Sequence, residues 1–429
     1  MMETGVNQIP DSQKRDAFGN IFDPNRGYAM GTVLSGPGDE VKRMLHGRSL
    51  IRERAAKYGR AGLFNLTGVT RDFPLSPDDV EGIHTQIDYY VQFDGSAEPI
   101  GITYAGGTPD RHGACLVTRV SAGMLAIMLT FAKAGDLVLS VVSKGRSHPS
   151  ISNAVNAVDG QFVEVIGVDA AAEAIRELSP KIVVLTTITP QKFYFSESEN
   201  RAVIDAARAA GAMVILDDAH GAVRTGFLGQ RPALELGEVS LALFSMDKHL
   251  HGPRAGLVAG DRESIKQLQA KVFEYGVEAP LPSYVAARRS MEGYNPAEIQ
   301  RAGVLAKEVA GQLAPDWNDF GLYMAGPGVA ASADDLSRLV LSRANKNGLS
   351  LVPVEVSSMV AMRLVETGGM MTILSIGMPG ASSALRLMMF PDGHLLGAKK
   401  IVDAVEEAVD FTIKHMDDHD FAKQYIRGA

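Results

Sequence analysis

The stretch Val214-Ile-Leu-Asp-Asp-Ala-His-Gly221 decides the fold expected for this chain. Its aliphatic residues run directly into two carboxylates, and His220 follows three positions after Asp217. A short apolar run that ends in polar residues is typical of a buried strand in an open α/β sheet, and such sheets bind ligands beyond the carboxyl ends of their strands. We therefore predict that Asp217 and His220 face a ligand. The alternative is that one aspartate caps the next element and that His220 is an ordinary loop histidine.

Similar short apolar runs precede and follow this stretch, each bounded by Gly, Pro, Asp or Ser. Helical patterns lie between them, and this alternation is typical of a mostly parallel sheet with helices on both faces. We predict an α/β fold whose large domain holds a mostly parallel seven-stranded sheet. The predicted strands are 114–120, 137–142, 162–166, 182–186, 213–216, 241–244 and 256–259. The predicted helices are 122–134, 150–158, 170–178, 199–210, 264–275 and 296–313.

The regions outside this sheet differ from it in residue composition and in hydrophobic pattern. Residues 1–62 are polar and charged, with one helical stretch, and we expect an N-terminal arm there. Residues 63–295 form the expected large domain, and residues 296–429 a smaller C-terminal α/β domain. The strands predicted in the smaller domain are 372–376 and 385–389, and its closing helix is 398–414.

The composition excludes several classes of protein. The chain has 429 residues, 46% of them hydrophobic, and a formal net charge of −8. It can bury a large core, and its acidic balance makes nucleic acid an unlikely partner. Cys115 is the sole cysteine, which excludes a disulfide framework and a multi-cysteine metal site and fits a reducing cytoplasm. We expect no metal, no signal peptide and no membrane span.

A second informative stretch is Phe244-Ser-Met-Asp-Lys-His-Leu-His-Gly-Pro-Arg-Ala-Gly256. Lys248 stands just past a predicted strand, before His249 and His251 and a glycine-rich turn. A sheltered lysine in such a place is a candidate for a depressed pKa and for Schiff-base chemistry. The alternative is a solvated surface lysine.

Together these stretches resemble the fold type I family of pyridoxal 5'-phosphate (PLP) enzymes, the aspartate aminotransferase superfamily. The motif Ser245-x-Asp247-Lys248-x-Leu250-x-Gly252-Pro253-x-Ala255-Gly256 is most similar to the bacterial selenocysteine synthase branch, which includes sugar-amino-acid ammonia lyases. Asn65-Leu-Thr-Gly68 also resembles the opening of that branch's catalytic domain. Residues 248–256 have a looser likeness to serine hydroxymethyltransferase, and residues 217–220 to α-oxoamine synthases and fold type I decarboxylases. The superfamily likeness covers residues 65–412.

The resemblance implies a role for each polar residue of the two stretches. Lys248 would hold PLP through a Schiff base and later move the Cα proton. Asp217 would pair with the pyridine nitrogen, so that the ring can accept the electron pair left at Cα. His220 would hydrogen-bond the phenolic oxygen of PLP, and Asp218 is assigned no catalytic role.

His148 follows the predicted strand 137–142. The resemblance implies that it stacks on the PLP ring, and an imidazole there can also act as an acid or base. A solvent-exposed loop histidine is the alternative.

The phosphate of PLP would bind where the predicted helix 122–134 begins. The free amides of Ser121, Ala122 and Gly123 would form an anion site there, with Ser245 as the hydroxyl donor. Close packing of small residues explains the same pattern, and Arg119 departs from the family patterns; it would serve either the phosphate or an acidic substrate group.

Arg386 lies on the predicted strand 385–389 of the smaller domain. Related enzymes keep an arginine there that clamps the substrate α-carboxylate, because a guanidinium fork fixes a carboxylate with two parallel hydrogen bonds. An arginine in a surface ion pair is the alternative.

The leading hypothesis is a PLP-dependent lyase or transferase that removes the Cα proton of an amino acid or amino-sugar acid and then eliminates or replaces its Cβ group. Alternatives are an aldolase or hydroxymethyltransferase, a decarboxylase, acyl-condensing enzyme, racemase or aminotransferase, and a non-catalytic regulatory protein of the same fold. A tRNA partner, as in the selenocysteine synthase branch, is opposed by the net charge of −8. The resemblance further implies a homodimer or larger assembly, with Tyr104, His251 and Arg254 as candidate residues supplied by a partner subunit.

Overall fold

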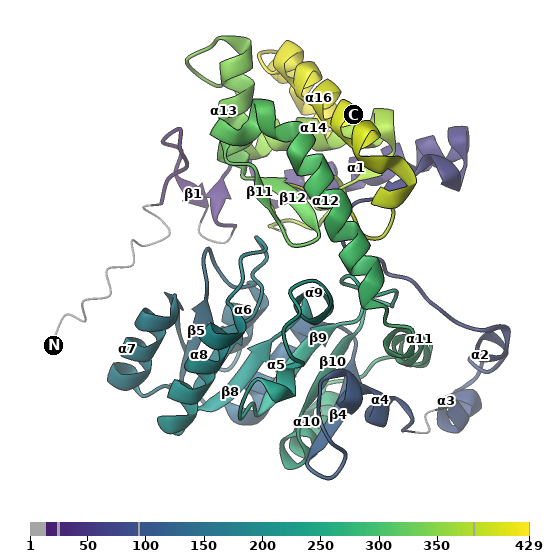
Figure 1. Ribbon diagram of the computed structural model, residues 1–429, viewed down its shortest axis with the longest axis vertical. Helices are drawn as coiled ribbons and strands as arrows, with labels where there is room; N and C mark the ends of the chain where they lie inside the picture. Colours follow the sequence, from purple (N-terminus) through teal and green to yellow (C-terminus); the bar gives the residue numbers. More distant parts are fainter. Residues whose placement is uncertain (1–13, 24–25, 93–94, 381, 429) are drawn as a thin grey trace. The chain divides into compact units, whose positions relative to one another are not determined.

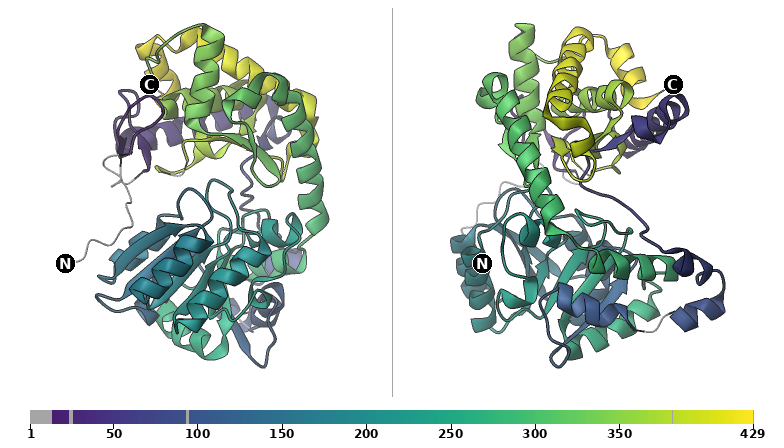
Figure 2. Two further views of the ribbon diagram at one scale, coloured as in Figure 1. Left: turned by 60° about the vertical axis from the view of Figure 1, so that its left-hand side comes forward. Right: turned by 45° about the vertical axis from the view of Figure 1, so that its right-hand side comes forward.

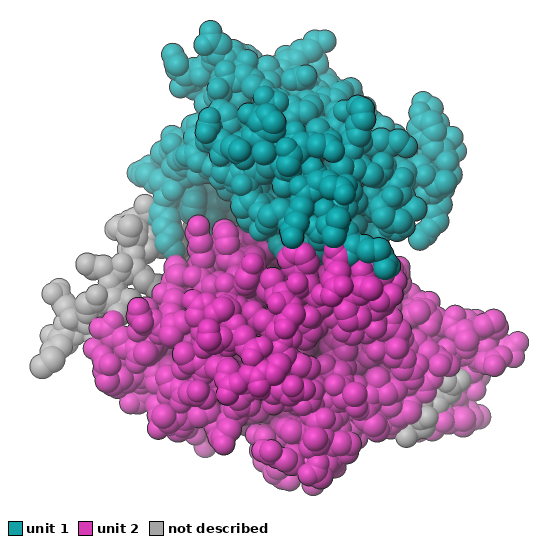
Figure 3. Space-filling model, viewed as in Figure 1, with its two compact units in different colours: residues 1–68, 301–429 teal, residues 69–300 magenta. Residues whose placement is uncertain are grey.

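The computed structural model describes residues 14–23, 26–92, 95–380 and 382–428. It divides the chain into two compact units, shown in Figure 3: unit 1 comprises residues 1–68 and 301–429, and unit 2 comprises residues 69–300. The sequence analysis expected three segments, whereas the structure groups the N-terminal residues with the C-terminal ones. Each unit is described by itself.

Unit 2 contains a seven-stranded sheet with the strand order β4-β10-β9-β8-β7-β5-β6 (Figure 1). The strands are β4 (His112–Val117), β5 (Leu137–Val142), β6 (Gln161–Ile166), β7 (Ile182–Thr186), β8 (Met213–Asp217), β9 (Leu241–Ser245) and β10 (Gly256–Asp261). The pairs formed by β5 to β9 are parallel, and β10 runs antiparallel to both β4 and β9. The predicted α/β class and the mostly parallel seven-stranded sheet are confirmed.

Helices cover both faces of this sheet, as the two views of Figure 2 show. One face packs against α4 (Ala97–Tyr104), α7 (Val168–Leu178), α8 (Glu197–Ala209) and α11 (Leu281–Glu292), and the other against α5 (Val120–Phe131), α6 (Ser150–Asn156) and α10 (Arg262–Glu274). Val183 and Leu185 of β7 enter the first core, whereas Ile182 and Val184 enter the second. Both faces are buried, which explains why the strands read as continuous apolar runs.

Shorter helices complete unit 2. They are α2 (Pro77–Glu81), α3 (Gln86–Gln92), α9 (Gly221–Gly226) and the 3₁₀ turn η3 (Ala233–Glu235). Helix α12 (Pro296–Trp317) begins in unit 2 and continues into unit 1.

Unit 1 contains small sheets and a layer of helices. Strands β11 (Tyr323–Met324), β12 (Gly328–Ala331) and β14 (Leu385–Met388) form an antiparallel sheet, β3 (Phe64–Asn65) pairs with β13 (Met370–Met371), and β1 (Phe22–Asp23) pairs with β2 (Tyr28–Ala29). Its helices are α1 (Pro37–Tyr58), α13 (Ala333–Ala344), α14 (Pro353–Gly368), α15 (Ile373–Ile376), α16 (Gly393–His415) and α17 (His419–Arg427), with the 3₁₀ turns η2 (Arg60–Gly62) and η4 (Asn318–Phe320).

A buried carboxylate ties the N-terminal residues into unit 1. Glu355, on α14, is fully buried and accepts hydrogen bonds from the amides of Val33 and Leu34, both at 2.7 Å. An unpaired carboxylate in such a place would be costly, so these amides hold the segment before α1 against α14.

The strand predicted at 372–376 is wrong. The chain forms helix α15 there, because the Thr372 side chain caps it by accepting a hydrogen bond from the Ser375 amide. Strand pairing with β3 occurs just before, at Met370 and Met371. The helix cap at Thr372 therefore outweighs the strand propensity of the β-branched residues in 372–376. The strand predicted at 385–389 and the helix predicted at 398–414 are present as β14 and α16.

Among the described residues, no helix combines the length and the apolar character that crossing a bilayer requires.

Candidate active site

The candidate site lies where the parallel strands of unit 2 end. Asp217 is the last residue of β8, and its backbone pairs with Thr186 on one side and Leu243 on the other. Lys248 stands in the turn after β9, where its backbone forms an antiparallel bridge to Val69. Parallel strands present their carboxyl ends at one edge, so two residues distant in sequence meet there.

Asp217 is a buried carboxylate under the influence of Lys248. Its side chain is 5% exposed and accepts a hydrogen bond from the Ala219 amide at 3.3 Å. Burial raises the pKa of Asp217, while the charge of Lys248 and the Ala219 amide act in the opposite direction. A buried carboxylate in this state suits a cationic ligand atom, because such a partner removes the cost of the buried charge.

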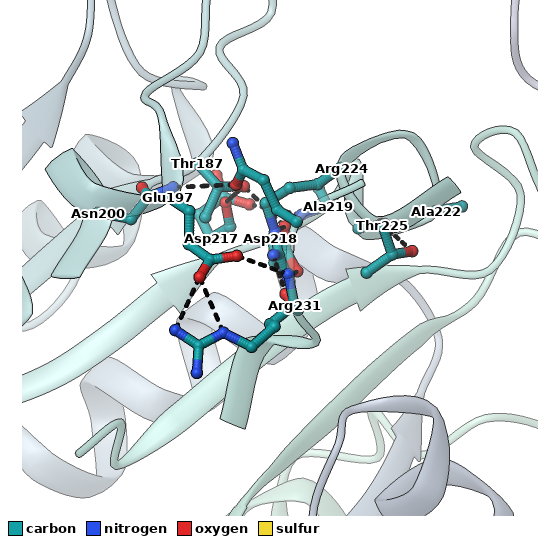
Figure 4. A network of polar contacts seen from close by, with 12 residues as sticks. Thr187, Glu197, Asn200, Asp217, Asp218, Ala219, Ala222, Arg224, Thr225 and Arg231 are labelled. Atoms are coloured by element: carbon teal, nitrogen blue, oxygen red, sulfur yellow. Dashed lines mark hydrogen bonds and ion pairs between the residues drawn. The ribbon is translucent and has the colours of Figure 1, made fainter. Parts of the chain in front are cut away.

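Asp218, the next residue, is closed off by its own partners (Figure 4). Its two oxygens accept from Nε and Nη2 of Arg224 at 2.9 and 2.7 Å, and the Thr187 hydroxyl donates to it at 2.7 Å. Both charged side chains are fully buried. This bidentate pair leaves Asp218 no access to a ligand, in keeping with the absence of an expected catalytic role.

His220 immediately precedes α9 and is 7% exposed. Nζ of Lys192 lies 2.7 Å from its Nε2. Lys192 comes from the turn after β7, is 6% exposed, and has a left-handed backbone with φ of 74°. A buried lysine on a strained backbone is typical of a functional site.

Lys192 was not among the site residues expected from the sequence. The signal that could have found it is the one used for Lys248, since Lys192 also follows a central strand of the sheet, β7. Lys192 lies several residues beyond the end of β7, so its position in the sequence does not indicate that it reaches the site. The turn that brings its side chain to His220 is set by tertiary contacts.

His148 lies in the loop after β5, where part of its side chain is open to solvent and the rest is surrounded by protein. Its Nδ1 is 2.8 Å from the Ser150 hydroxyl. The pKa of His148 falls to about 4 because surrounding protein displaces water from the ring and because Lys248, Arg119 and Arg146 place positive charge nearby. The ring is therefore neutral at physiological pH and within the electrostatic reach of Lys248.

The predicted phosphate turn needs a correction. Helix α5 begins at Val120, and the amides of Ala122 and Gly123 donate to the carbonyl of Arg119 at 3.0 and 3.1 Å. The helix starts two residues earlier than expected, so these two amides are not free, and Ser121 belongs to the first turn, where amides lack helical partners.

Close packing explains Gly123 at least as well as anion binding does. A Cβ on Gly123 would lie 3.1 Å from a methyl group of Val117 and 3.3 Å from one of Val258. The alternative reading of the small residues in this turn thus has direct structural support.

Ser245 is buried, and its hydroxyl donates to Asp247 at 2.7 Å. A phosphate could take this proton only by displacing the Asp247 carboxylate as its acceptor. The expected hydroxyl donor therefore lies in the right turn but is engaged within the protein.

The polar atoms at this edge of the sheet fit the chemical groups of PLP. Within the described part of the chain, the buried hydroxyl oxygens of Thr186 and Ser143, at the ends of β7 and β5, have no hydrogen-bond partner. Gly256 leaves room beside the start of α5, since a Cβ there would lie 2.9 Å from the Val120 amide nitrogen. Open hydroxyls, a helix start, a buried carboxylate and a lysine match the phosphate, the ring nitrogen and the aldehyde of PLP.

Arg386 lies in unit 1, on β14, where its backbone pairs with Ala330. The side chain is 8% exposed, and burial lowers its pKa while Tyr323 acts in the opposite direction. It is therefore not an arginine of a solvated surface ion pair.

Two of the candidate partner-supplied residues are engaged inside unit 2. The Tyr104 ring packs edge-on against Phe244 and Tyr294, at 5.5 Å between centroids in both cases. The two ring nitrogens of His251 lie 2.8 Å from Asp72 and 3.1 Å from a Glu298 oxygen.

Comparison with known proteins agrees with this geometry. No protein-family model matches the chain. The chain is 30% identical over 401 residues to a UPF0425 pyridoxal phosphate-dependent protein of Methanothermobacter thermautotrophicus, covering 92% of this chain and 100% of that protein. A serine hydroxymethyltransferase of Leptospira biflexa is 26% identical over 178 residues, which is 38% of this chain and 40% of that enzyme.

Solved structures resemble the chain in fold. Serine palmitoyltransferase from S. paucimobilis matches with a TM-score of 0.55 and 17% identity, covering 86% of this chain and 84% of that one. Alanine–glyoxylate aminotransferase from Nostoc sp. matches with a TM-score of 0.54 and 15% identity, covering 82% of this chain and 95% of that one. These likenesses show the fold type I architecture, and the superfamily prediction is confirmed.

Proposed function

Because the chain belongs to the UPF0425 family of pyridoxal phosphate-dependent proteins, we propose that it is a PLP enzyme that acts on an amino acid or amino-sugar acid. The proposed reaction removes the Cα proton and then eliminates or replaces the Cβ group, as in a lyase or transferase. The observation that carries this proposal is the buried carboxylate of Asp217 within the electrostatic reach of Lys248 at the carboxyl edge of the sheet.

PLP, when bound, supplies a ring that accepts the electron pair left on Cα. Lys248 would provide the amine that holds the cofactor and a base for the Cα proton. Asp217 would pair with the protonated ring nitrogen, and this pairing would offset the cost of burying its own charge. His148, whose low pKa keeps it neutral, is able to accept a proton near Lys248.

The remaining assignments follow the same reasoning. His220 is proposed to face the phenolic oxygen, with Lys192 at its Nε2. Ser121, Ala122, Gly123 and Ser245 mark the start of α5 and the end of β9, where we propose that the phosphate binds, with only the Ser121 amide left as a candidate free donor among the three. Arg386 is proposed to bind the substrate α-carboxylate, and its support is its buried position on β14.

A second candidate reaction is cleavage of the Cα–Cβ bond, as in hydroxymethyl transfer. It is favoured by the similarity to serine hydroxymethyltransferase over 178 residues. The two reactions use the same cofactor residues and differ in their products. With serine, elimination releases ammonia and a keto acid, whereas cleavage releases glycine and formaldehyde, so product analysis with serine separates them.

The test of the cofactor site is an absorption spectrum of the purified protein with PLP, followed by borohydride reduction and peptide mapping. We expect a visible band and a pyridoxyl group attached to Lys248. Lys192 is the matched control, because it is a second buried lysine at the same edge of the sheet. The label should persist in Lys192→Met and vanish in Lys248→Ala, and a label on Lys192 in the unaltered protein would overturn the assignment.

We also propose that the enzyme works in the cytoplasm as a homodimer or larger assembly on small-molecule substrates, without a membrane or nucleic-acid partner. The single cysteine supports a reducing compartment. Sedimentation analysis tests the assembly, and a purely monomeric enzyme with full activity would overturn that part.

A further inference from the structure

Three arginines gather beside the turn that carries Lys248. Arg119 is the residue that precedes α5, Arg254 stands two residues before β10, and Arg71 lies two residues after the start of unit 2. The side chains of all three arginines are exposed. Arg71 and Arg254 have no role in the cofactor chemistry described above, and for Arg119 the sequence left open the cofactor phosphate or an acidic substrate group.

Backbone pairing brings the three segments together. The amide of Thr70 donates to the carbonyl of Asp247 at 2.8 Å, which places Arg71 next to the Lys248 turn. In the sheet, Gly256 pairs with Ser245 on one side and with Val117 on the other. The start of β10, the end of β9 and the end of β4 are therefore neighbours. Arg254 precedes β10, the Lys248 turn follows β9, and Arg119 follows β4.

The charges of the cluster act on one another. The pKa of Arg119 is lowered, first by partial burial and then by the charges of Arg254 and Arg71, while Asp247 acts in the opposite direction. Nε of Arg71 lies 3.9 Å from Oδ2 of Asp247, and Asp247 also accepts the Ser245 hydroxyl. Like charges held close together raise the free energy of the ligand-free protein, and an anion removes that cost.

Further cations stand at the same edge of the sheet. Lys144 lies over the ring of Phe193, with Nζ 4.7 Å from its centroid, and Arg146 is close enough to lower the pKa of His148. Lys192 adds a buried amine that contacts the His220 ring. The whole chain has a net charge of −8, so this positive surplus is local and is not a reflection of composition.

A phosphate and an α-carboxylate do not account for this surplus. A phosphate monoester carries about two negative charges at neutral pH and a carboxylate one. Asp218 is already neutralised by Arg224, and Asp217 is assigned to the ring nitrogen. Five cationic side chains stand at this edge, Arg71, Arg119, Arg254, Lys144 and Arg146, with Asp247 interleaved among the arginines and Asp72 paired with His251.

We propose that the substrate carries a second anionic group in addition to its α-carboxylate, and that Arg71, Arg119 and Arg254 bind it. The group is a carboxylate or a phosphate on the side chain of the amino acid, since a guanidinium binds both with paired hydrogen bonds. This inference rests on the proposed function, because it names the substrate class of the same site.

The test measures binding of amino acids to the PLP-loaded enzyme by calorimetry, in matched charged and neutral pairs. The pairs are aspartate and asparagine, glutamate and glutamine, and O-phosphoserine and serine. We expect at least one charged member to bind about tenfold or more tightly than its neutral counterpart, with a preference that weakens as salt rises. The pair that shows the preference separates a carboxylate from a phosphate.

Arg71→Gln is the principal variant. We expect it to weaken binding of the charged member about ten- to a hundredfold and to leave the neutral member unchanged. The affinity of the apoprotein for PLP, measured by fluorescence titration, should stay as in the unaltered protein. Arg254→Gln is a second variant with the same expectation. Lys266→Gln on α10 is the control, because it removes one exposed positive charge that pairs with Glu263 at 3.6 Å and does not belong to the three-arginine cluster.

Three outcomes overturn the proposal. In the first, no charged amino acid binds more tightly than its neutral counterpart. In the second, the protein binds tRNA and none of the amino acids, and Arg71→Gln abolishes tRNA binding. In the third, Arg71→Gln and Arg254→Gln weaken PLP binding and leave the charge preference intact, which assigns the arginines to the cofactor phosphate. Failure of the proposed function itself is distinct, because then no PLP attaches to Lys248 in the unaltered protein.

Discussion

Two charged clusters at the same edge of the sheet are built in opposite ways. In the first, Asp218 and Arg224 are both fully buried and saturate each other through two hydrogen bonds. In the second, Arg71 and Arg119 lie near Asp247, Arg254 acts on Arg119, and all three arginines are exposed. The first arrangement satisfies every charge inside the protein and serves stability, whereas the second leaves positive charge for a ligand to complete.

The largest expected effect separates chemistry from stability. Lys248→Ala should lower turnover at least about a thousandfold, because it removes both the attachment point of the cofactor and the proposed base. The free energy of unfolding of the apoprotein should change by less than about 0.5 kcal/mol, since the side chain is only partly buried. Turnover assays and urea unfolding check the two halves, and substantial residual activity would contradict the role of Lys248.

Breaking the buried Asp218–Arg224 pair should lower the stability of the protein, whereas Lys248→Ala should lower its turnover. Arg224→Met leaves the buried Asp218 carboxylate without its partner and should lower the free energy of unfolding by about 3–5 kcal/mol. Urea unfolding of the apoprotein measures it. The double variant with Asp218→Asn should recover a large part of the loss, because the uncompensated charge is gone. A loss below about 1 kcal/mol in the single variant would show that the pair is not structurally important.

Asp217→Asn should distinguish the two neighbouring aspartates. Burial raises the pKa of Asp217 above its unfolded value, so its contribution to stability is present at low pH and is lost as the pH rises through the folded pKa. The apoprotein of Asp217→Asn should therefore be more stable than the unaltered apoprotein at neutral pH, whereas Asp218→Asn should be less stable. PLP affinity should fall about tenfold or more in Asp217→Asn. Equal destabilisation by both substitutions would contradict the comparison.

The pKa of His148 measures the positive charge around the second cluster, because, in addition to burial, Lys248, Arg119 and Arg146 all lower it. Its pKa of about 4 predicts that the ring stays neutral from pH 5 upwards and that NMR titration of the apoprotein shows no change for it near pH 6.5. Arg146→Gln should raise the pKa of His148, because it removes one of the charges that lower it. An ordinary titration near 6.5 in the unaltered protein would mean that the surplus charge does not reach His148.

The smallest effect is expected at His251, a histidine whose charge is paired. Its hydrogen bond to Asp72 raises its pKa, with partial burial acting against it and Glu298 adding to it. The folded state therefore binds the proton more tightly, and the contribution is full below about pH 6.5 and is lost as the pH rises through the folded pKa. His251→Gln should cost less than about 1 kcal/mol at pH 6 and nothing measurable at pH 9, since the side chain is about half exposed.

The core of unit 2 was readable from the sequence because its signal is local. Each strand is an aliphatic run between helix-like segments, and burial on both faces makes that run continuous. Asp217 and Lys248 stood out because a polar residue directly after such a strand lies at the ligand-binding edge. The strand predicted at 372–376 failed because the Thr372 cap, a contact of one side chain, decided between helix and strand.

By itself, the sequence determined the α/β class, the seven strands and the resemblance that pointed to PLP, since periodicity and strand-end chemistry are properties of short stretches. Only the tertiary structure decided that residues 1–68 join unit 1, that Lys192 reaches His220, and that three distant arginines meet beside Asp247. The physical reason is that these contacts depend on which segments pair across long separations. Pairing at that range is set by packing and by the mutual satisfaction of buried polar groups, which no local pattern encodes.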